Sequence, residues 1–175
     1  MKTSRTKFIK AQAIFFGIVS FIFLCNGQNI FNSRTVFSGI WKLNFEKSDF
    51  GKVSAENAAA SSIEIIQDYE SFEIKRNLHS GESSTEHLTF DGKKLISKLP
   101  PPRNITKTSY LEWSKDQMFL TVFQHYKIVG EEEATWELDR TEKYSLSPDG
   151  NTLYVEIVSV YPNRTEAVKA AYDKK

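Results

Sequence analysis

The stretch that decides the fold is residues 37–48, which read FSGIWKLNFEKS. It places Gly39 two residues before Trp41 and predicts a first strand over Gly39–Phe45. From residue 62 onward, apolar side chains recur with a period of two, which is the period of a half-buried β-strand. The sequence therefore predicts a series of antiparallel strands that can curl around Trp41.

Further strands are separated by turn signals such as Asp91-Gly92 and Ser147-Pro148-Asp149-Gly150, which favour tight connections. Residues 47–62 are expected to form a loop, with at most a helical turn, and prolines 100–102 a stiff connection. The strands expected after the first are Ser62–Asp68, Ser71–Leu78, Ser83–Phe90, Lys94–Lys98, Thr106–Trp113, Gln117–Ile128, Ala134–Leu146, Thr152–Tyr161 and Thr165–Tyr172. The last of these segments is equally compatible with a short helix.

This pattern predicts an all-β protein, an antiparallel up-and-down barrel of about eight to ten strands, because short loops join neighbouring strands. An open meander would leave two unpaired edges, and closure into a barrel removes them. A barrel of this size has room inside for side chains or for one small ligand.

The N-terminal segment has the pattern of a secretory signal peptide over residues 1–27. A basic stretch ending at Lys10 precedes an apolar run over Ala11–Leu24, and Cys25 follows at once. The apolar run is shorter than the roughly 20 residues that span a bilayer. A membrane anchor and a lipid-anchored Cys25 are the alternatives. We expect export to the periplasm or the extracellular space, no stable membrane span after cleavage, and a domain over residues 28–175.

Composition narrows the partners of that domain. The formal net charge of +1 becomes about −3 once Lys2, Arg5, Lys7 and Lys10 leave with the leader, so a nucleic-acid partner is not expected. The single cysteine, Cys25, leaves as well, and the remaining chain then has no disulfide and no thiol nucleophile.

The motif Gly39-Ile40-Trp41, followed by Lys42-Leu43-Asn44, resembles the first strand of lipocalin-like (calycin-type) exported bacterial proteins. The hairpin at Ser147-Pro148-Asp149-Gly150 and the end of the chain, Ala171-Tyr172-Asp173-Lys174, are similar too. The resemblance implies that the Trp closes one end of the barrel and that a late Arg packs on its indole. Arg140 and Arg164 both fit that role. A Thr-Asp-Tyr-like second motif is absent, so the resemblance does not identify a ligand.

Arg140 lies on the otherwise apolar face of Ala134–Leu146, next to Glu142 on that face. An inward arginine must be paired or stacked. It therefore either caps Trp41, or meets the acid end of a ligand, or is exposed at a strand end. Strand 117–128 has two largely apolar faces, which indicates cover on both sides. The residues expected to line a ligand cavity are Tyr110, Phe119, Phe123, Trp136 and Arg140.

Signals for catalysis, metals and cofactors are weak. The three histidines, His79, His87 and His125, lack metal-ligand spacing, and no Gly-rich phosphate loop or Gly-x-Ser-x-Gly motif occurs. Only His125 and Glu142 could act as an acid/base pair. We therefore expect no metal and no cofactor.

The leading hypothesis is a barrel that binds a small apolar or amphipathic molecule and is not an enzyme. A structural or interaction module of the cell envelope, with a side-chain-filled barrel, is the alternative. A barrel enzyme is the third possibility. Any protein partner remains unspecified.

Overall fold

The computed structural model describes residues 34–99, 104–130 and 134–175, which belong to one compact unit, Asn32–Lys175. The expected leader over residues 1–27, prolines 100–102 and the acidic loop 131–133 lie outside the described residues.

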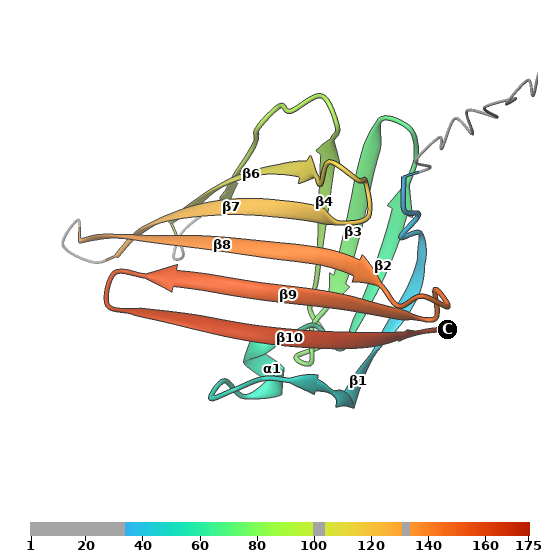
Figure 1. The fold of residues 1–175 in the computed structure, drawn as a ribbon. Helices are drawn as coiled ribbons and strands as arrows, with labels where there is room; N and C mark the ends of the chain where they lie inside the picture. Colours follow the sequence, from blue (N-terminus) through green and yellow to red (C-terminus); the bar gives the residue numbers. More distant parts are fainter. Residues whose placement is uncertain (1–33, 100–103, 131–133) are drawn as a thin grey trace, which may run out of the picture. The chain divides into compact units, whose positions relative to one another are not determined.

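The described chain is built from antiparallel strands and one short helix, α1 (Figure 1). All ten expected strands are confirmed, and the segment that was compatible with strand or helix is a strand. The elements in order are β1 (Gly39–Asp49), α1 (Ala55–Ala58), β2 (Ser62–Gln67), β3 (Ser71–Asn77), β4 (Ser83–Thr89), β5 (Leu95–Leu99), β6 (Ile105–Trp113), β7 (Leu120–Val129), β8 (Thr135–Leu146), β9 (Thr152–Tyr161) and β10 (Arg164–Lys174).

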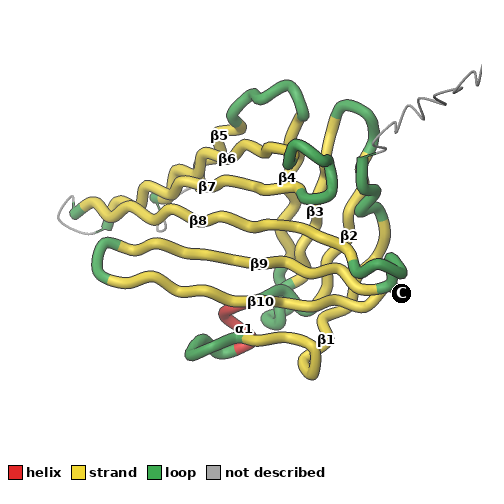
Figure 2. Tube along the Cα trace, viewed as in Figure 1, coloured by secondary structure: helices red, strands yellow, loops and turns green. Residues whose placement is uncertain are grey.

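The strands form a single ten-stranded sheet in the order β4-β3-β2-β1-β10-β9-β8-β7-β6-β5. Neighbours in sequence pair with one another, and the pairing of β1 with β10 joins the first strand to the last. Strands β4 and β5 are the two edges of the sheet, and side chains rather than a backbone ladder connect β4 to β6. The protein is therefore a nearly closed all-β barrel, as the sequence predicts. Figure 2 shows the loops gathered at the two ends of the strands.

Alternation along each strand decides which side chains enter the barrel. In β8 the buried side chains are Glu142 and Tyr144, and the residues between and beside them are more exposed. In β7 they are Leu120, Val122 and Gln124. Because successive side chains of a strand point to opposite faces, the even-numbered residues of both strands face inward.

One end of the barrel is closed by aromatic side chains. Phe37 and Trp41 are fully buried, and the indole Nε1 of Trp41 donates to the Phe37 carbonyl oxygen at 2.9 Å. The Phe37 ring stacks on Trp113 and meets Phe72 and Tyr144 edge-on. The apolar core is therefore concentrated at this closed end, where Trp41 was expected.

The backbone conformation at Gly39 favours glycine, because its φ of +151° is disfavoured for other residues. Space is not the reason, since a Cβ there would lie in ordinary contact, 3.6 Å from Trp41 Nε1. The expectation that Arg140 or Arg164 packs on the indole of Trp41 is wrong. Arg140 pairs with Glu142, and Arg164 lies over Tyr161. Lys174, in register with Trp41, places its Nζ 5.5 Å from the indole ring instead.

The segment before β1 is tied to the closed end over residues 34–38. The Thr35 amide donates to the Gln117 carbonyl at 3.1 Å, and Gln67 Nε2 donates to the Thr35 carbonyl at 3.0 Å. The Phe37 amide donates in turn to Gln67 Oε1 at 3.0 Å. These bonds hold Phe37 in place as the plug of the barrel. Within the described part of the chain, no helix has the length and apolar character needed to cross a bilayer.

We expect replacement of Trp41 by Ala to lower the free energy of unfolding by roughly 3–5 kcal/mol, the usual cost of removing a large buried aromatic ring. Urea denaturation followed by far-UV circular dichroism measures the change. Trp136→Ala is the matched control, because Trp136 is 59% exposed and its loss should cost less than about 1 kcal/mol. Equal effects of the two substitutions would contradict the role of Trp41 in the core.

Candidate functional site

A layer of charged and polar side chains crosses the barrel interior above the aromatic core. Glu142 is its centre. Oε2 accepts from Arg76 Nη2 at 2.6 Å and from the Tyr144 hydroxyl at 2.5 Å, and Oε1 accepts from Arg140 Nε at 2.9 Å. Arg76 comes from β3 and Glu142 from β8, strands that are not neighbours in the sheet. The carboxylate therefore ties opposite walls of the barrel together.

The charge state of this layer follows from its contacts. Burial alone would raise the pKa of Glu142, but the positive charges of Arg76 and Arg140 and the hydrogen bonds to the carboxylate hold that pKa well below its usual range. Burial also raises the pKa of Tyr144 well above its ordinary value. Glu142 is therefore an anion, and Tyr144 a neutral donor, at every pH near neutrality.

A second carboxylate, Glu86, extends the layer to the unpaired edge of β4. Its Oε2 accepts from Arg76 Nη1 at 3.3 Å and from Gln124 Nε2 at 3.2 Å. Lys107 Nζ lies 3.0 Å from Glu86 Oε1, an ion pair that lacks hydrogen-bond geometry. Lys107 belongs to β6, so this contact spans the gap in the sheet. Tyr126 completes the layer by donating to Gln124 Oε1 at 3.0 Å.

The layer carries more positive than negative charge. Arg76, Arg140 and Lys107 face only the two carboxylates of Glu86 and Glu142. Within the described part of the chain, the Arg140 side chain makes no hydrogen bond beyond the one from Nε, and a quarter of that side chain is exposed. The guanidinium of Arg140 therefore has donors that the layer itself does not use.

The space around the layer is almost filled. Segment 51–61, which contains α1, places the buried Ala58, Ala59 and Ala60 against it. A cavity of about 20 Å³ lies beside Glu142, and one of about 40 Å³ lies between Arg140 and Tyr161. Each has room for about one water molecule. The interior of the barrel is thus packed rather than hollow.

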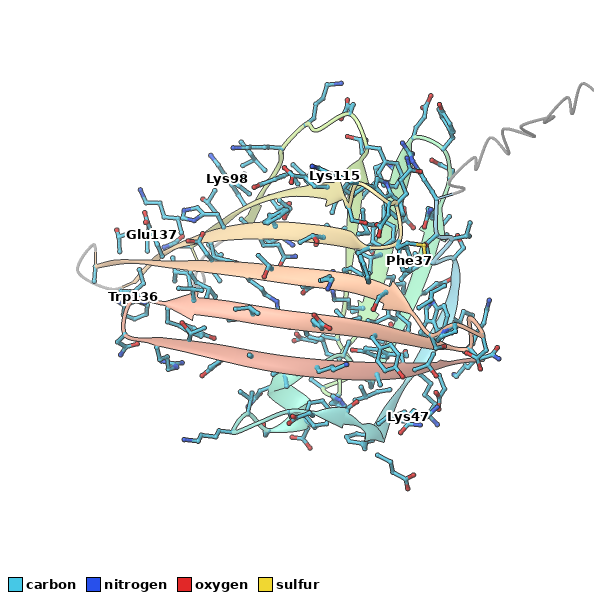
Figure 3. The ribbon with its side chains drawn as sticks, in the orientation of Figure 1. Phe37, Lys47, Lys98, Lys115, Trp136 and Glu137 are labelled. Carbon is cyan, nitrogen blue, oxygen red and sulfur yellow. The ribbon has the colours of Figure 1, made fainter. Side chains whose placement is uncertain are left out.

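An open cleft of about 520 Å³ lies farther along the same strands, at the end away from Trp41. Its apolar wall consists of Ile128, Trp136, Leu138 and Tyr161, and its polar rim includes Arg164. Tyr161 borders both the cleft and the 40 Å³ cavity beside Arg140. Figure 3 shows Trp136 at this end of β8, and Phe37 toward the other end of the strands. This cleft is open to solvent and mostly apolar in its lining.

The rim of the cleft has its own ion pair. Arg164 Nε donates to Glu166 Oε1 at 2.8 Å, and its guanidinium carbon lies 4.0 Å from the Tyr161 ring centroid. Arg164 is exposed at the β9–β10 turn. It presents a cation next to the apolar wall.

Two of the five residues expected to line a cavity occupy the inner face. Trp136 lines the cleft, and Arg140 borders both small cavities. The inward orientation expected for the other three is wrong. Tyr110 and Phe123 are partners in the β6–β7 ladder and stack on each other at 4.9 Å on the outer face, opposite the buried Ser109 and Val122.

Phe119 also lies outside, with Lys143 Nζ 4.4 Å from its ring. The error has one cause: β7 is apolar on both faces, so its alternation could not show which face enters the barrel.

The expected acid/base pair does not form. His125 is exposed on the outer face, where its Nδ1 lies 2.8 Å from Asp139 Oδ1, while Glu142 is inside. Among the residues the structure describes, no group of three His, Cys, Asp or Glu side chains could hold a metal ion.

Arg76 and Glu86 are the site residues that sequence reasoning missed. The signal was present, because a period of two places Arg76 on the face of Phe72 and Ile74, and Glu86 on the face of Leu88. Because Arg76 and Glu86 each lie on an otherwise apolar face, their positions indicated two more inward charges that need partners.

Substituting Glu142 by Gln should destabilise the protein by about 3–5 kcal/mol at pH 7, because it leaves two buried arginines without their shared anion. It should also change the response to acid. A carboxylate with a lowered pKa contributes stability that is complete above its unfolded pKa of about 4.3 and is lost as the pH falls. Below about pH 5, wild-type stability should therefore fall more steeply than that of the variant.

Urea unfolding at pH values from 7 to about 3 tests both parts of this prediction. Glu156→Gln is the matched control, since Glu156 is half-exposed in its pair with Lys143 and should matter by less than about 1 kcal/mol. Parallel acid profiles for wild type and Glu142→Gln would show that Glu142 is not the buried anion.

Comparison with known proteins supports the fold. No family model and no curated protein sequence matches the chain. Among solved structures, the chain is similar to zebrafish ileal bile acid-binding protein complexed with cholic acid, with a TM-score of 0.52 and 12% sequence identity. The match covers 81% of this chain and 100% of the zebrafish protein. At this identity the likeness establishes a shared barrel architecture.

Proposed function

We propose that this protein binds a small amphipathic molecule with an acidic end, and that the binding site is the cleft at the open end of the barrel. The observation that carries the proposal is the 520 Å³ cleft, walled by Ile128, Trp136, Leu138 and Tyr161. Its volume lies within the range of small-molecule sites. Trp136 is 59% exposed on the inner face of the barrel, and a ligand in the cleft would cover it.

The polar rim favours an anionic end group. Arg164 is exposed beside the apolar wall, and its guanidinium carbon lies 4.0 Å from the Tyr161 ring centroid. A guanidinium recognises a carboxylate through paired hydrogen bonds. The apolar body of the ligand would lie on Trp136 and Tyr161, and its acid would reach Arg164.

The comparison is consistent with this class of ligand, because the similar zebrafish structure is a bile acid-binding protein in complex with cholic acid. Cholic acid is itself an amphipathic acid. The position of the ligand in this chain would differ from a hollow-barrel site, because the small interior cavities of 20 and 40 Å³ cannot hold such a molecule.

The packed interior is the observation that favours the second candidate, a structural or interaction module with a side-chain-filled barrel. That function needs no saturable ligand site. We also propose that the protein is exported and that its leader is cleaved. N-terminal sequencing of the mature protein tests this.

Binding is tested by titrating the protein with 1-anilinonaphthalene-8-sulfonate and displacing the dye with dodecanoate, cholate or dodecan-1-ol. We expect saturable dye binding, displacement by both acids, and weaker displacement by the neutral alcohol. Absence of saturable dye binding would favour the structural module.

Trp136→Ala should weaken dodecanoate binding about tenfold, because it removes the largest apolar surface of the cleft, a loss of about 1.4 kcal/mol. Tyr110→Ala is the control: Tyr110 is an aromatic ring on the outer face and its loss should leave the affinity unchanged. Displacement titrations on the folded variants measure both. If both variants bind alike, the cleft is not the site.

Arg164→Gln should weaken binding of dodecanoate about five- to tenfold, since it removes a charge-assisted contact worth about 1 kcal/mol or more. Binding of dodecan-1-ol should stay within twofold, because the alcohol has no charge to lose. A parallel loss for the acid and the alcohol would mean that Arg164 shapes the cleft without recognising the acid.

A further inference from the structure

A second cluster of aromatic side chains lies at the closed end of the barrel, away from the cleft. Tyr69 comes from the β2–β3 turn, Phe90 follows β4, and Trp113 ends β6. The guanidinium carbon of Arg34 lies 5.7, 5.1 and 5.8 Å from the centroids of these three rings. A cation within about 6 Å of an aromatic face is attracted by the ring quadrupole. We call these three rings the aromatic clamp.

The two inner rings of the clamp are fixed before any cation arrives. Trp113 stacks on the buried Phe37 with ring centroids 5.9 Å apart and an interplanar angle of 20°. Phe90 packs on Trp113 at 5.7 Å. Tyr69, by contrast, is 86% exposed and forms an adjustable outer wall. The clamp is therefore preorganised on its inner side and open on its outer side.

The surroundings of the clamp favour positive charge. A hollow of about 440 Å³ is lined by Arg34, Tyr69, Phe90 and two carboxylates, Glu70 and Asp91. Hydrogen bonds from Lys93 and Thr89 lower the pKa of Asp91, and this anion is already paired with Lys93 Nζ at 2.5 Å. Glu70 therefore supplies the negative charge of the hollow that an external cation would meet. This hollow shares no residue with the cleft at the open end.

Arg34 itself is held loosely in this hollow. Its one hydrogen bond within the described residues is from Nη1 to the Tyr69 carbonyl at 3.3 Å, and no carboxylate there forms a salt bridge with it. The next residue, Thr35, is fixed by its own bonds to Gln117 and Gln67. Arg34 can therefore leave the clamp while the segment that carries it stays in place.

We propose that the aromatic clamp is a second binding site, one that takes an organic cation such as a guanidinium or quaternary ammonium group, and that Arg34 occupies it as an intramolecular stand-in. An external cation reaches the rings when the Arg34 side chain swings out. The contacts are cation–π interactions with two rigid rings and one adjustable ring, and Glu70 adds attraction at the rim.

The test uses Arg34→Gln, which keeps a long polar side chain but removes the competing charge. Choline is titrated into ¹⁵N-labelled wild type and variant, and the indole N–H signals of the three tryptophans are followed. In the variant we expect a saturable shift of the Trp113 signal with a dissociation constant on the order of millimolar. Wild type should bind at least fivefold more weakly, because Arg34 competes. Trp41 and Trp136 should not respond.

Three controls separate charge recognition from nonspecific effects. The neutral isostere 3,3-dimethylbutan-1-ol should bind Arg34→Gln at least fivefold more weakly than choline does. Arg34→Gln/Phe90→Leu should lose choline binding. Lys174→Gln, which removes a cation from the single buried ring of Trp41, should gain none.

Thermal unfolding confirms that each variant is folded. The proposal is overturned if Arg34→Gln binds choline no better than wild type does, if the alcohol binds as well as choline, or if the double variant retains binding.

Discussion

The rest of the structure depends on the burial of one carboxylate, Glu142, between two arginines. An ionised carboxylate in an apolar interior is costly unless its charge and its lone pairs are satisfied. Arg76 and Arg140 supply the charge, and with Tyr144 they supply the hydrogen bonds. Because Arg76 belongs to β3, this network connects the two walls of a sheet that backbone pairing alone leaves open between β4 and β5.

This network divides the barrel into three levels. Below it lies the aromatic core around Phe37 and Trp41, which closes one end. The charged layer, covered by the alanines of segment 51–61, fills the middle. Above it, the inner faces of β7, β8 and β9 contribute Ile128, Trp136 and Tyr161 to the open cleft. The aromatic core that stabilises the fold and the cleft of the proposed binding site therefore lie at different levels, and the charged layer separates them.

The order of the strands and the face of β8 could be predicted from the sequence, because polar and apolar residues alternate there and turn signals bound each strand. For Arg140 the sequence left three roles open, and the structure instead pairs it with Glu142, two residues away on the same face of β8. The inner face of β7 could not be predicted in the same way, since Phe123 on its outer face is as apolar as Val122 on its inner face. The role of residues 34–38 depends on partners such as Gln67 and Gln117, which are distant in sequence and give no local signal.

The charged layer also explains why the ligand site is expected at the mouth of the barrel rather than in its centre. Where an apolar interior is empty, a ligand can fill it. Here Glu142 already supplies the anion that the inward arginines need, and the residual cavities hold about one water molecule each. Placing a ligand acid beside Arg140 would require it to displace Glu142 or to move segment 51–61, and both carry a cost in buried charge or lost packing. Arg164 offers a guanidinium at the edge of the apolar wall without either cost, so the proposed binding at the cleft would require no rearrangement of the charged layer.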